Sequence, residues 1–467
     1  MLAHRRVRRV ALIDPVGDAG IGGYSHELAM GLCANEVRVD LYTRGASFAS
    51  ALPRAYRLVP VFGVTPDAFT VALDDALSDA SELPQPPALG GEPTESAAQL
   101  RPALAPYFDL LDRRSARTEH DRAPQRSHDE ARDVTRPTQP AAATRVAATN
   151  GERQMSHALA RHVRRQQYDL LWTQWPDLGP LGADVCSESG RAGVPLVHTV
   201  HNVLPHERCA GDATDHRATY RRADALVVHS DAAGRSLTEH FPDEARKLVH
   251  SRHGLYTIYP RASHARAYVR SRLRLRDDQT ALLIFGGVRP YKNLDATIDA
   301  LHAVRARRED VVLVVAGWEW GYHDTVPGDA LGRTRRLVAS LGLHDQVRLL
   351  PGPFGVRQTA ELFEAADAVA LPYIESFGSG VLCMAMTYGK HVLATDAGGM
   401  HEYLATYEHH TPVRDASTSA IADAIACLPR TGATDARATR CAHLEWPAIA
   451  RRALDDLGSL VHARRLA

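Results

Sequence analysis

The sequence predicts an α/β protein built from two doubly wound domains that face each other across a cleft. Short runs rich in Val, Ile and Leu alternate with helical segments along most of the chain, which indicates parallel βαβ units. Gly and Pro bound these runs, and their continuous apolar character is typical of strands buried on both faces. A linker-like stretch at 253–267 divides them into two series, so we expect domains over 1–255 and 256–446 and a last helix over 447–467.

The elements of each series follow in order along the chain. The first series has strands expected at 7–14, 37–43, 57–62, 169–174, 195–200 and 225–230, with helices at 24–34 and 152–167. The second has strands expected at 281–288, 311–317, 347–352, 368–372 and 391–396, with helices between them. Ligands of such domains bind beyond the carboxyl ends of the strands, so the loops there are the first place to look for a site.

An insertion interrupts the first series at about 65–150. This segment is rich in Arg, Asp, Pro and Ala and poor in large aliphatic residues. Because it cannot bury enough apolar surface to offset its ordering entropy, we expect it to be mostly disordered. A short helical stretch at 102–114 within it is a candidate lid or docking segment.

Composition limits the class of protein. The 467 residues suffice for two domains with ample cores, and 55 basic side chains balance 55 acidic ones. This balance gives no attraction to nucleic acid, so no such partner is expected. The six cysteines show no CxxC spacing and are expected to be reduced thiols in a cytoplasmic protein.

The N-terminus is basic, but its apolar run stops at Asp14, which is too short for a signal peptide. Four arginines within the first nine residues are compatible with peripheral contact to an anionic membrane, at the inner face. A solvated strand entry is the simpler interpretation, and we favour it.

Three loops carry candidate chemistry. After the first strand, Gly22 and Gly23 would let backbone approach an anionic ligand at a helix N-terminus. A dinucleotide fingerprint is the rival interpretation, since Asp40 ends the next strand, but GxGxxG is not met because position 25 is serine. A tight structural turn is the third interpretation.

The second loop follows the strand that contains His198. His198 and His201 point to opposite faces of an extended segment, and with His206 they form no metal-ligand spacing, so no metal is expected. His201 and Asn202, at the strand's carboxyl end, are placed to meet a substrate; a satisfied structural histidine is the alternative.

In the third loop, "FGGVRPYKN", a strand ends in Gly286 and Gly287, and Arg289 and Lys292 follow. Two cations at the presumed cleft suit a diphosphate, with Arg as a fork and Lys as a point charge. Asn293 is a candidate cap for the next helix. Plain solvation of both cations is the alternative.

Seven motifs in this order resemble the retaining, family-4-type (group 1) glycosyltransferases of the GT-B fold: "GIGGYSHELA", "HTVHN", "VVHSD", "HGL", "FGGVRPYKN", "ESFGSG" and "LATDAGGMHE". The resemblance spans nearly the whole chain except 65–150. It implies two Rossmann-like domains, of which the N-terminal one serves the acceptor and the C-terminal one holds a nucleotide-sugar donor. It also implies no metal, no cofactor, and a last helix that crosses back to the N-terminal domain.

The resemblance also implies roles for single residues. Glu375 matches the first glutamate of the family's Glu–seven residues–Glu motif, which reaches donor-sugar hydroxyls, and His201 would contact the sugar near the reacting carbon. The donor-binding set would be Gly22, Gly23, Gly287, Ser376, Phe377, Gly378 and Ser379, with backbone N–H groups after Glu375 on the phosphate.

Two departures from the family pattern stand out. The second glutamate, which usually binds ribose, is replaced by Cys383, which we expect to be a buried packing residue. The family's usual arginine position holds Gly287, and the cation is Arg289 two residues later. Positions two apart in extended backbone share a face, so this cation can be kept.

We therefore expect a glycosyltransferase that moves a sugar from a nucleotide diphosphate donor to a glycan or lipid-linked glycan, with Arg289, Lys292, Glu375 and His201 at the reaction centre. Three alternatives are left open. They are a GT-B-fold sugar-nucleotide epimerase, a non-catalytic partner of another glycosyltransferase, which Cys383 motivates, and an NAD-dependent oxidoreductase.

Overall fold

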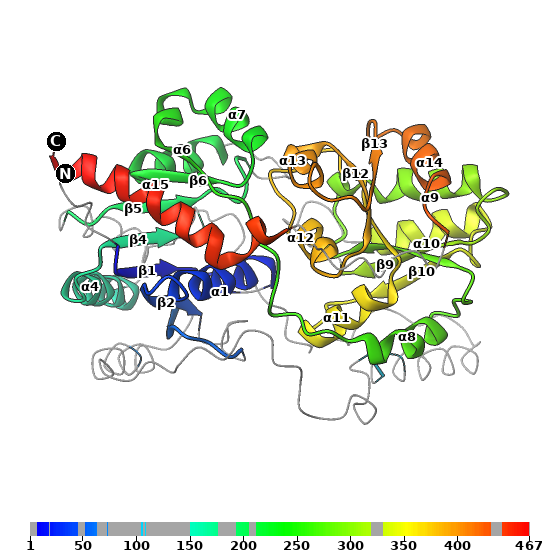
Figure 1. Cartoon of the computed structure of the whole chain (residues 1–467), viewed down its shortest axis with the longest axis horizontal. Coiled ribbons are helices and arrows are strands. Elements are labelled where there is room, and N and C mark those ends of the chain that lie inside the picture. The colour runs from blue at the N-terminus through cyan, green and yellow to red at the C-terminus, as the bar shows by residue number, and fades with distance from the viewer. Residues whose placement is uncertain are drawn as a thin grey trace.

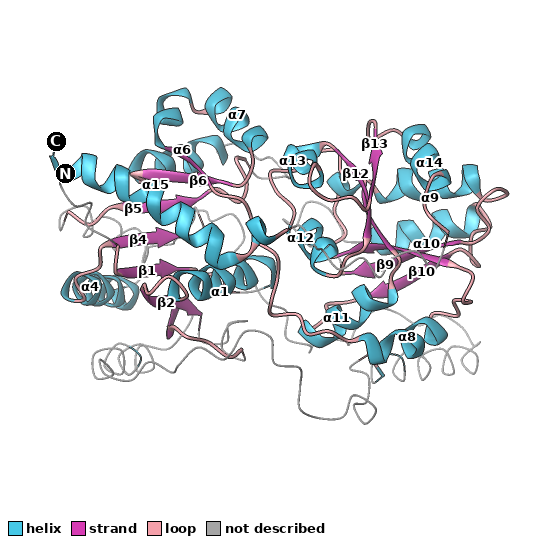
Figure 2. Ribbon diagram, viewed as in Figure 1, coloured by secondary structure: helices cyan, strands magenta, loops and turns pink. Residues whose placement is uncertain are grey.

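Two α/β lobes lie side by side, with the N-terminal strands in one and the C-terminal strands in the other (Figure 1). The computed structural model describes residues 7–17, 19–44, 52–62, 72, 104–105, 108, 150–175, 193–204, 212–318, 330–430 and 441–466. Each lobe is a parallel sheet with helices on both faces (Figure 2). The expected fold class is confirmed: two Rossmann-like domains in the GT-B arrangement.

The N-terminal sheet has seven strands in the order β3-β2-β1-β4-β5-β6-β7. The strands are β1 (Arg9–Ile13), β2 (Arg38–Arg44), β3 (Arg57–Phe62), β4 (Leu170–Thr173), β5 (Leu196–Thr199), β6 (Ala225–Val228) and β7 (Leu248–His250). Its helices are α1 (Ala19–Cys33), α4 (Asn150–Arg165), α6 (Asp212–Arg222) and α7 (Asp231–His240). The sequence pattern missed β7, because a run of three residues is too short to show periodicity.

The C-terminal sheet has six strands in the order β10-β9-β8-β11-β12-β13. The strands are β8 (Thr280–Phe285), β9 (Val311–Gly317), β10 (Val347–Pro351), β11 (Ala368–Leu371), β12 (His391–Thr395) and β13 (His410–Val413). Its helices are α8 (Arg266–Arg272), α9 (Leu294–Val304), α10 (Ala330–Ser340), α11 (Val356–Ala365), α12 (Gly380–Thr387), α13 (Met400–Leu404) and α14 (Thr418–Ala426). All five expected strands are present, and β13 was not expected.

The strand order creates two switch points, between β1 and β4 and between β8 and β11, where consecutive connections leave in opposite directions. Ligands of doubly wound sheets bind in the crevice at such a point. The loops that follow β1, β8 and β11 therefore frame the candidate site.

The last helix, α15 (Trp446–Leu466), runs back across the N-terminal lobe and packs on α1 (Figure 1). Trp446 begins this helix and lies where two glycines leave room for it. A methyl group on Gly31 would lie 2.7 Å from the Trp446 carbonyl oxygen, and one on Gly254 would lie 2.5 Å from its indole ring. Glycine at both positions therefore lets α15 close against α1.

The linker between the domains is fastened to α1 by Glu27. This carboxylate accepts hydrogen bonds from the backbone N–H of Thr257, from the Thr257 hydroxyl at 2.9 Å and from the Ile258 N–H at 3.0 Å. Burial raises the pKa of Glu27 to about 7, and the three hydrogen bonds limit that rise.

Most of the insertion expected at about 65–150 lies outside the described residues. Within it, Leu104 and Phe108 are buried in the core of the C-terminal domain. The Leu104 N–H donates to the buried carboxylate of Glu361 at 2.7 Å, and the guanidinium of Arg272 lies over the Phe108 ring. These two residues of the segment therefore contribute to the C-terminal core.

One arginine of the basic N-terminus, Arg9, forms an ion pair inside the fold. Arg9 donates to the buried carboxylate of Asp40 at 3.0 Å, and Arg57 donates to the same carboxylate at 2.8 Å.

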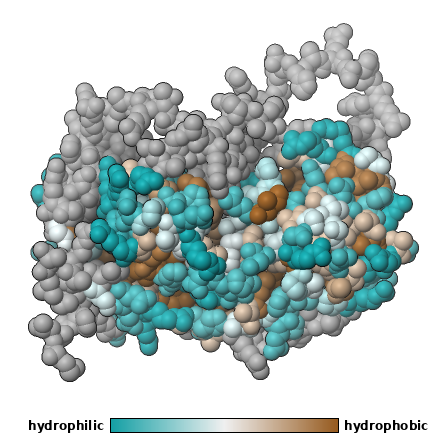
Figure 3. Space-filling model, turned by 90° about the horizontal axis from the view of Figure 1, so that it is seen from above, coloured by the Kyte–Doolittle hydropathy of each residue, from teal (hydrophilic) through white to brown (hydrophobic). Residues whose placement is uncertain are grey.

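Within the described residues no helix has the length and apolarity needed to cross a bilayer. The face seen in Figure 3 is mostly polar, with separate apolar areas.

We expect Gly31→Ala to lower the free energy of unfolding by about 1–3 kcal/mol, because the added methyl group overpacks the contact between α1 and α15. Gly20→Ala is the matched control on the same helix, since a methyl group there meets nothing within 4 Å. Urea unfolding of both variants measures the difference. Equal stability of the two would contradict the packing described for Trp446.

Candidate active site

The loop after β8 carries the two predicted cations. Lys292 is buried, and its Nζ donates to the carbonyl oxygen of Phe285 at 2.5 Å. A methyl group on Gly286, which has a φ of +94°, would lie 2.9 Å from that Nζ, so glycine is needed for the ammonium to reach this position. Burial and the nearby Arg289 guanidinium lower the pKa of Lys292 to about 7.

Arg289 and Gly287 lie in the same loop and are half-buried. Arg289 has extended backbone (φ −131°, ψ 151°) just before the short turn that contains Lys292. Asn293 lies at the expected N-cap position of α9, but the capping hydrogen bond expected of its side chain is absent. Its backbone is left-handed, and its side-chain amide donates to the carbonyl of Ala416 at 2.7 Å.

The loop after β11 ends in the N-terminus of α12. Ser379 caps this helix by accepting a hydrogen bond from the Leu382 N–H at 3.1 Å. Ser376 is buried, and its hydroxyl donates to the carbonyl of Gly378 at 2.8 Å, which fixes the turn. Glu375 is half-buried just ahead of the turn. The first peptide N–H groups of α12 thus lie beside Glu375, and a helix N-terminus favours an anion.

Phe377 belongs to this loop but packs into the other domain. Its ring is 5% exposed and is part of the N-terminal hydrophobic cluster with Val200, Tyr220 and Phe241. The side chain therefore joins the lobes, and only the backbone of Phe377 is placed for the predicted donor contact.

On the N-terminal side, His201 lies in a cluster of aromatic and imidazole rings around Tyr24. The Tyr24 ring centroid is 4.8 Å from that of His201 and 5.1 Å from those of His229 and His253. His201 also pairs through Nε2 with Gln174 at 3.2 Å. Burial and the neighbouring imidazoles hold the pKa of His201 well below its usual range, so the ring is neutral.

Gly22 and Gly23 are buried and lie inside α1, which begins at Ala19. The glycine-rich loop is therefore shorter than the sequence indicated. The turn before α1 is held by Asp14, which accepts from the Gly17 N–H at 2.9 Å and from the Ser25 hydroxyl at 2.8 Å. These contacts leave the two glycines at the start of the helix, facing buried surroundings.

Asp40 is not available to a dinucleotide. It is fully buried in β2, opposite Ala11 in the neighbouring strand. Burial raises its pKa, but the hydrogen bonds from Arg57 and Tyr168 outweigh this and hold the pKa of Asp40 below its usual range. Because its carboxylate is already paired inside the fold, Asp40 cannot bind a ribose hydroxyl. The acidic residue that a dinucleotide site would need is therefore not available here.

His198 is a buried structural histidine. It is 1% exposed and pairs through Nδ1 with the Thr173 hydroxyl at 2.9 Å. His206 lies outside the described residues. Among the described parts of the chain, no group of three or more His, Cys, Asp or Glu side chains is arranged to hold a metal ion.

Cys383 is buried on α12, as predicted, and is 1% exposed. Its thiol lies 3.8 Å from the carbonyl oxygen of His253, and burial raises its pKa well above the usual range. A neutral thiol in this position packs against the C-terminal core and is a poor partner for ribose hydroxyls.

The sequence pattern alone did not indicate Tyr24, His229 and His253 as site residues. All three lie inside quoted motifs, so the available signal was their position at the carboxyl ends of strands or at the start of a helix. His229 and His253 converge because they follow β6 and β7, which are neighbours in the N-terminal sheet, and the sequence pattern missed β7.

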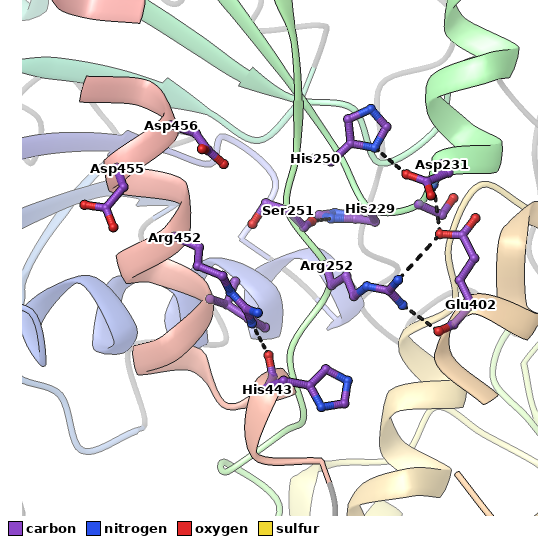
Figure 4. A pocket seen from close by; sticks show the side chains of 12 residues that line it. His229, Asp231, His250, Ser251, Arg252, Glu402, His443, Arg452, Asp455 and Asp456 are labelled. Atoms are coloured by element: carbon purple, nitrogen blue, oxygen red, sulfur yellow. Dashed lines mark hydrogen bonds and ion pairs between the residues drawn. The ribbon is translucent and has the colours of Figure 1, made fainter. Parts of the chain in front are cut away.

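A hollow lies between the lobes beside α15 (Figure 4). It has a volume of about 430 Å³ and is lined by charged side chains of both signs. Asp455 and Asp456 of α15 lie on one side, and the pair Arg252–Glu402 lies on the other (Figure 4). It does not include the cationic loop or Glu375.

The two Rossmann-like domains, with two cations and a helix N-terminus in the C-terminal one and neutral imidazoles in the N-terminal one, have the GT-B fold. Residues 266–440 match the family described as glycosyl transferases group 1, and residues 118–249 match glycosyltransferase family 4. The chain belongs to the group 1 glycosyltransferases and is an enzyme of that family.

Relatives named D-inositol 3-phosphate glycosyltransferase are similar over much of the chain. The protein from Streptomyces scabiei is 28% identical over 422 residues, which are 85% of this chain and 78% of the relative. The protein from Salinispora arenicola is 34% identical over 256 residues, which are 50% of this chain and 54% of the relative.

Solved structures support the fold alone. Anabaena HepE in complex with UDP and glucose has a TM-score of 0.55 and 15% identity, with 98% of this chain and 99% of that chain covered. The catalytic domain of Arabidopsis thaliana starch synthase IV, bound to ADP and acarbose, has a TM-score of 0.59 and 10% identity, with 99% and 100% covered.

The lowered pKa of Lys292 predicts a pH-dependent affinity for nucleoside diphosphate. The bound phosphates favour the ammonium form, so affinity should be highest below pH 7 and fall by up to about tenfold per pH unit above it. Lys292→Met should bind more weakly at pH 6.5 and lose this decline. Calorimetry between pH 6.5 and 8.5 measures both, and identical slopes for the two proteins would remove Lys292 from the phosphate site.

Proposed function

We propose that the enzyme transfers a sugar from a nucleotide diphosphate donor to an acceptor hydroxyl with retention of configuration and without a metal. The observation that carries this is the convergence, in one loop after β8, of Arg289 and the buried Lys292 at the sheet's switch point. A diphosphate is the leaving group that such a pair of cations suits. The N-terminus of α12 adds a second source of positive potential.

In this proposal the cations act on charge that develops as the donor bond breaks. Arg289, Lys292 and the α12 N-terminus would stabilise the departing diphosphate, which lowers the barrier because the groups are already in place. Glu375, just ahead of α12, would accept hydrogen bonds from donor-sugar hydroxyls. His201 would contact the sugar from the N-terminal side as a neutral imidazole.

Two classes of acceptor follow from different observations. The motif resemblance favours a glycan or lipid-linked glycan in polysaccharide or glycoconjugate biosynthesis. The names of the relatives favour a small phosphorylated polyol. We propose the glycan class first and the phosphorylated polyol as the second candidate.

Donor screening separates the proposal from its alternatives. We expect calorimetry with a panel of nucleotide diphosphate sugars to identify at least one binder, and mass spectrometry to detect transfer to an acceptor. Conversion of the bound sugar without an acceptor would favour an epimerase. Failure to bind every donor of the panel would favour a non-catalytic partner.

Glu375→Gln should lower turnover by an amount equivalent to about 2 kcal/mol or more of transition-state stabilisation, because it removes a charged hydrogen-bond partner. Cys383→Ser is the contrasting variant on the following helix and should leave turnover within a few-fold, since the thiol is a packing group. Steady-state kinetics with the selected donor tests both. Loss of activity in Cys383→Ser alone would show that the loop is not the donor site.

A further inference from the structure

His229 follows β6 and is a buried histidine with an unused acceptor. The residue is 2% exposed, and its Nε2 is buried without a hydrogen-bond partner in the structure. Its Nδ1 lies 2.9 Å from the carbonyl oxygen of Ser251. A buried polar atom without a partner costs free energy, so its persistence requires a reason.

The Ser251 contact decides the tautomer. A carbonyl oxygen can only accept, so Nδ1 carries the hydrogen and donates it. Burial lowers the pKa of His229 to about 4, so the ring is neutral and Nε2 presents a lone pair. Nε2 can therefore only accept a hydrogen bond. A phosphate oxygen, which also only accepts, is excluded as its partner, and a hydroxyl fits.

The His229 ring lies between the two halves of the candidate site. Its centroid is 5.5 Å from that of His201 and 5.1 Å from that of Tyr24. On the other side, Cδ2, the ring atom bonded to Nε2, is 3.8 Å from where a methyl group on Gly378 would lie. The side of His229 that carries Cβ and Cδ2 thus faces the turn that leads into α12, with Nε2 next to Cδ2 in the ring.

His253 provides the comparison. It lies in the same cluster, with its ring centroid 5.8 Å from that of His229, yet both of its nitrogens have partners. Nδ1 pairs with the Gly254 carbonyl at 2.7 Å, and Nε2 with the Tyr256 hydroxyl at 3.3 Å. Burial in this cluster therefore does not by itself leave a nitrogen unpaired.

We propose that His229 is a substrate-contacting residue whose Nε2 accepts a hydrogen bond from a ligand hydroxyl, either on the transferred sugar or on the acceptor. This inference rests on the proposed function, because it needs a hydroxyl-bearing ligand between His201 and Gly378. Besides His201, the N-terminal domain would then have a second imidazole that binds a ligand hydroxyl group rather than a phosphate.

Two substitutions separate the nitrogens. In His229→Asn the amide can still donate to the Ser251 carbonyl from near the Nδ1 position, but no atom remains at Nε2. In His229→Gln the longer amide reaches the Nε2 position and can restore the acceptor. His198→Asn is the matched control, because it removes another buried imidazole of the same domain that lies on β5 and pairs with Thr173.

The test measures the affinities of the variants for UDP and UDP-glucose. If wild type selects a different donor from the panel, that nucleotide sugar and its nucleoside diphosphate are used instead. If the hydroxyl belongs to the sugar, His229→Asn should bind the nucleotide sugar about three- to tenfold more weakly and bind the diphosphate as wild type does. If it belongs to the acceptor, both affinities and donor hydrolysis stay unchanged and the acceptor KM rises by a similar factor. In either case His229→Gln should recover part of the loss.

Unchanged affinities and kinetics in His229→Asn would overturn the inference and leave Nε2 to a water molecule. Equal weakening of diphosphate and nucleotide sugar, together with a lower thermal midpoint than that of His198→Asn, would also overturn it and indicate a structural role. Wild-type protein that binds no donor of the panel would instead contradict the proposed function.

Discussion

The contact between the segment Asp396–Glu402 and the N-terminus of α7 holds the two domains in the arrangement on which the site depends. The carboxylate of Glu402 accepts from the backbone N–H groups of Asp231 and Ala232 at 2.9 and 3.1 Å, so a residue of one domain caps a helix of the other. The Ser230 hydroxyl donates to the carbonyl of Gly398 at 2.9 Å.

The same segment fixes the loop after β11. A methyl group on Gly398 would lie 2.3 Å from the Ser376 carbonyl oxygen, and one on Gly399 would lie 2.9 Å from Cβ of Ser230. Both glycines have positive φ, at +66° and +78°, and residues other than glycine rarely adopt such values. The turn ahead of α12 is thus packed directly against the interdomain contact, and Phe377 extends from it into the N-terminal core.

Tyr403 links this contact to the histidines. Its hydroxyl donates to the His229 carbonyl at 2.8 Å and accepts from the His253 N–H at 2.9 Å. A C-terminal residue thereby sets the backbone that carries two of the imidazoles around Tyr24. Arg289 and Lys292 of the C-terminal domain supply positive charge, whereas the imidazoles around Tyr24 are neutral; under the proposed function this suits transfer between an anionic donor and a neutral hydroxyl.

Much of this architecture could be predicted from the sequence because it is local. Apolar runs bounded by Gly and Pro predicted most of the strands. The burial of Cys383 also followed from its place on an apolar helix. The strand β7 has only three residues, and β13 contains His410, Thr411 and Pro412, so neither shows an apolar run.

The rest depends on contacts between distant segments. Asn293 lies at the N-cap of α9, but its backbone is left-handed and its side-chain amide donates to the distant carbonyl of Ala416, so it makes no side-chain cap. The grouping of His201, His229 and His253 arises where the carboxyl ends of β5, β6 and β7 meet in the N-terminal sheet, whereas the placement of the Phe377 side chain arises only when the domains meet.

A crystal structure of the enzyme with UDP tests the central claim most directly, namely that the cleft holds a diphosphate on its C-terminal side. The account predicts the phosphates within hydrogen-bond distance of Arg289, Lys292 and the first peptide N–H groups of α12. A diphosphate held at the start of α1, beside Gly22 and Gly23 and without contact to either cation, would contradict it.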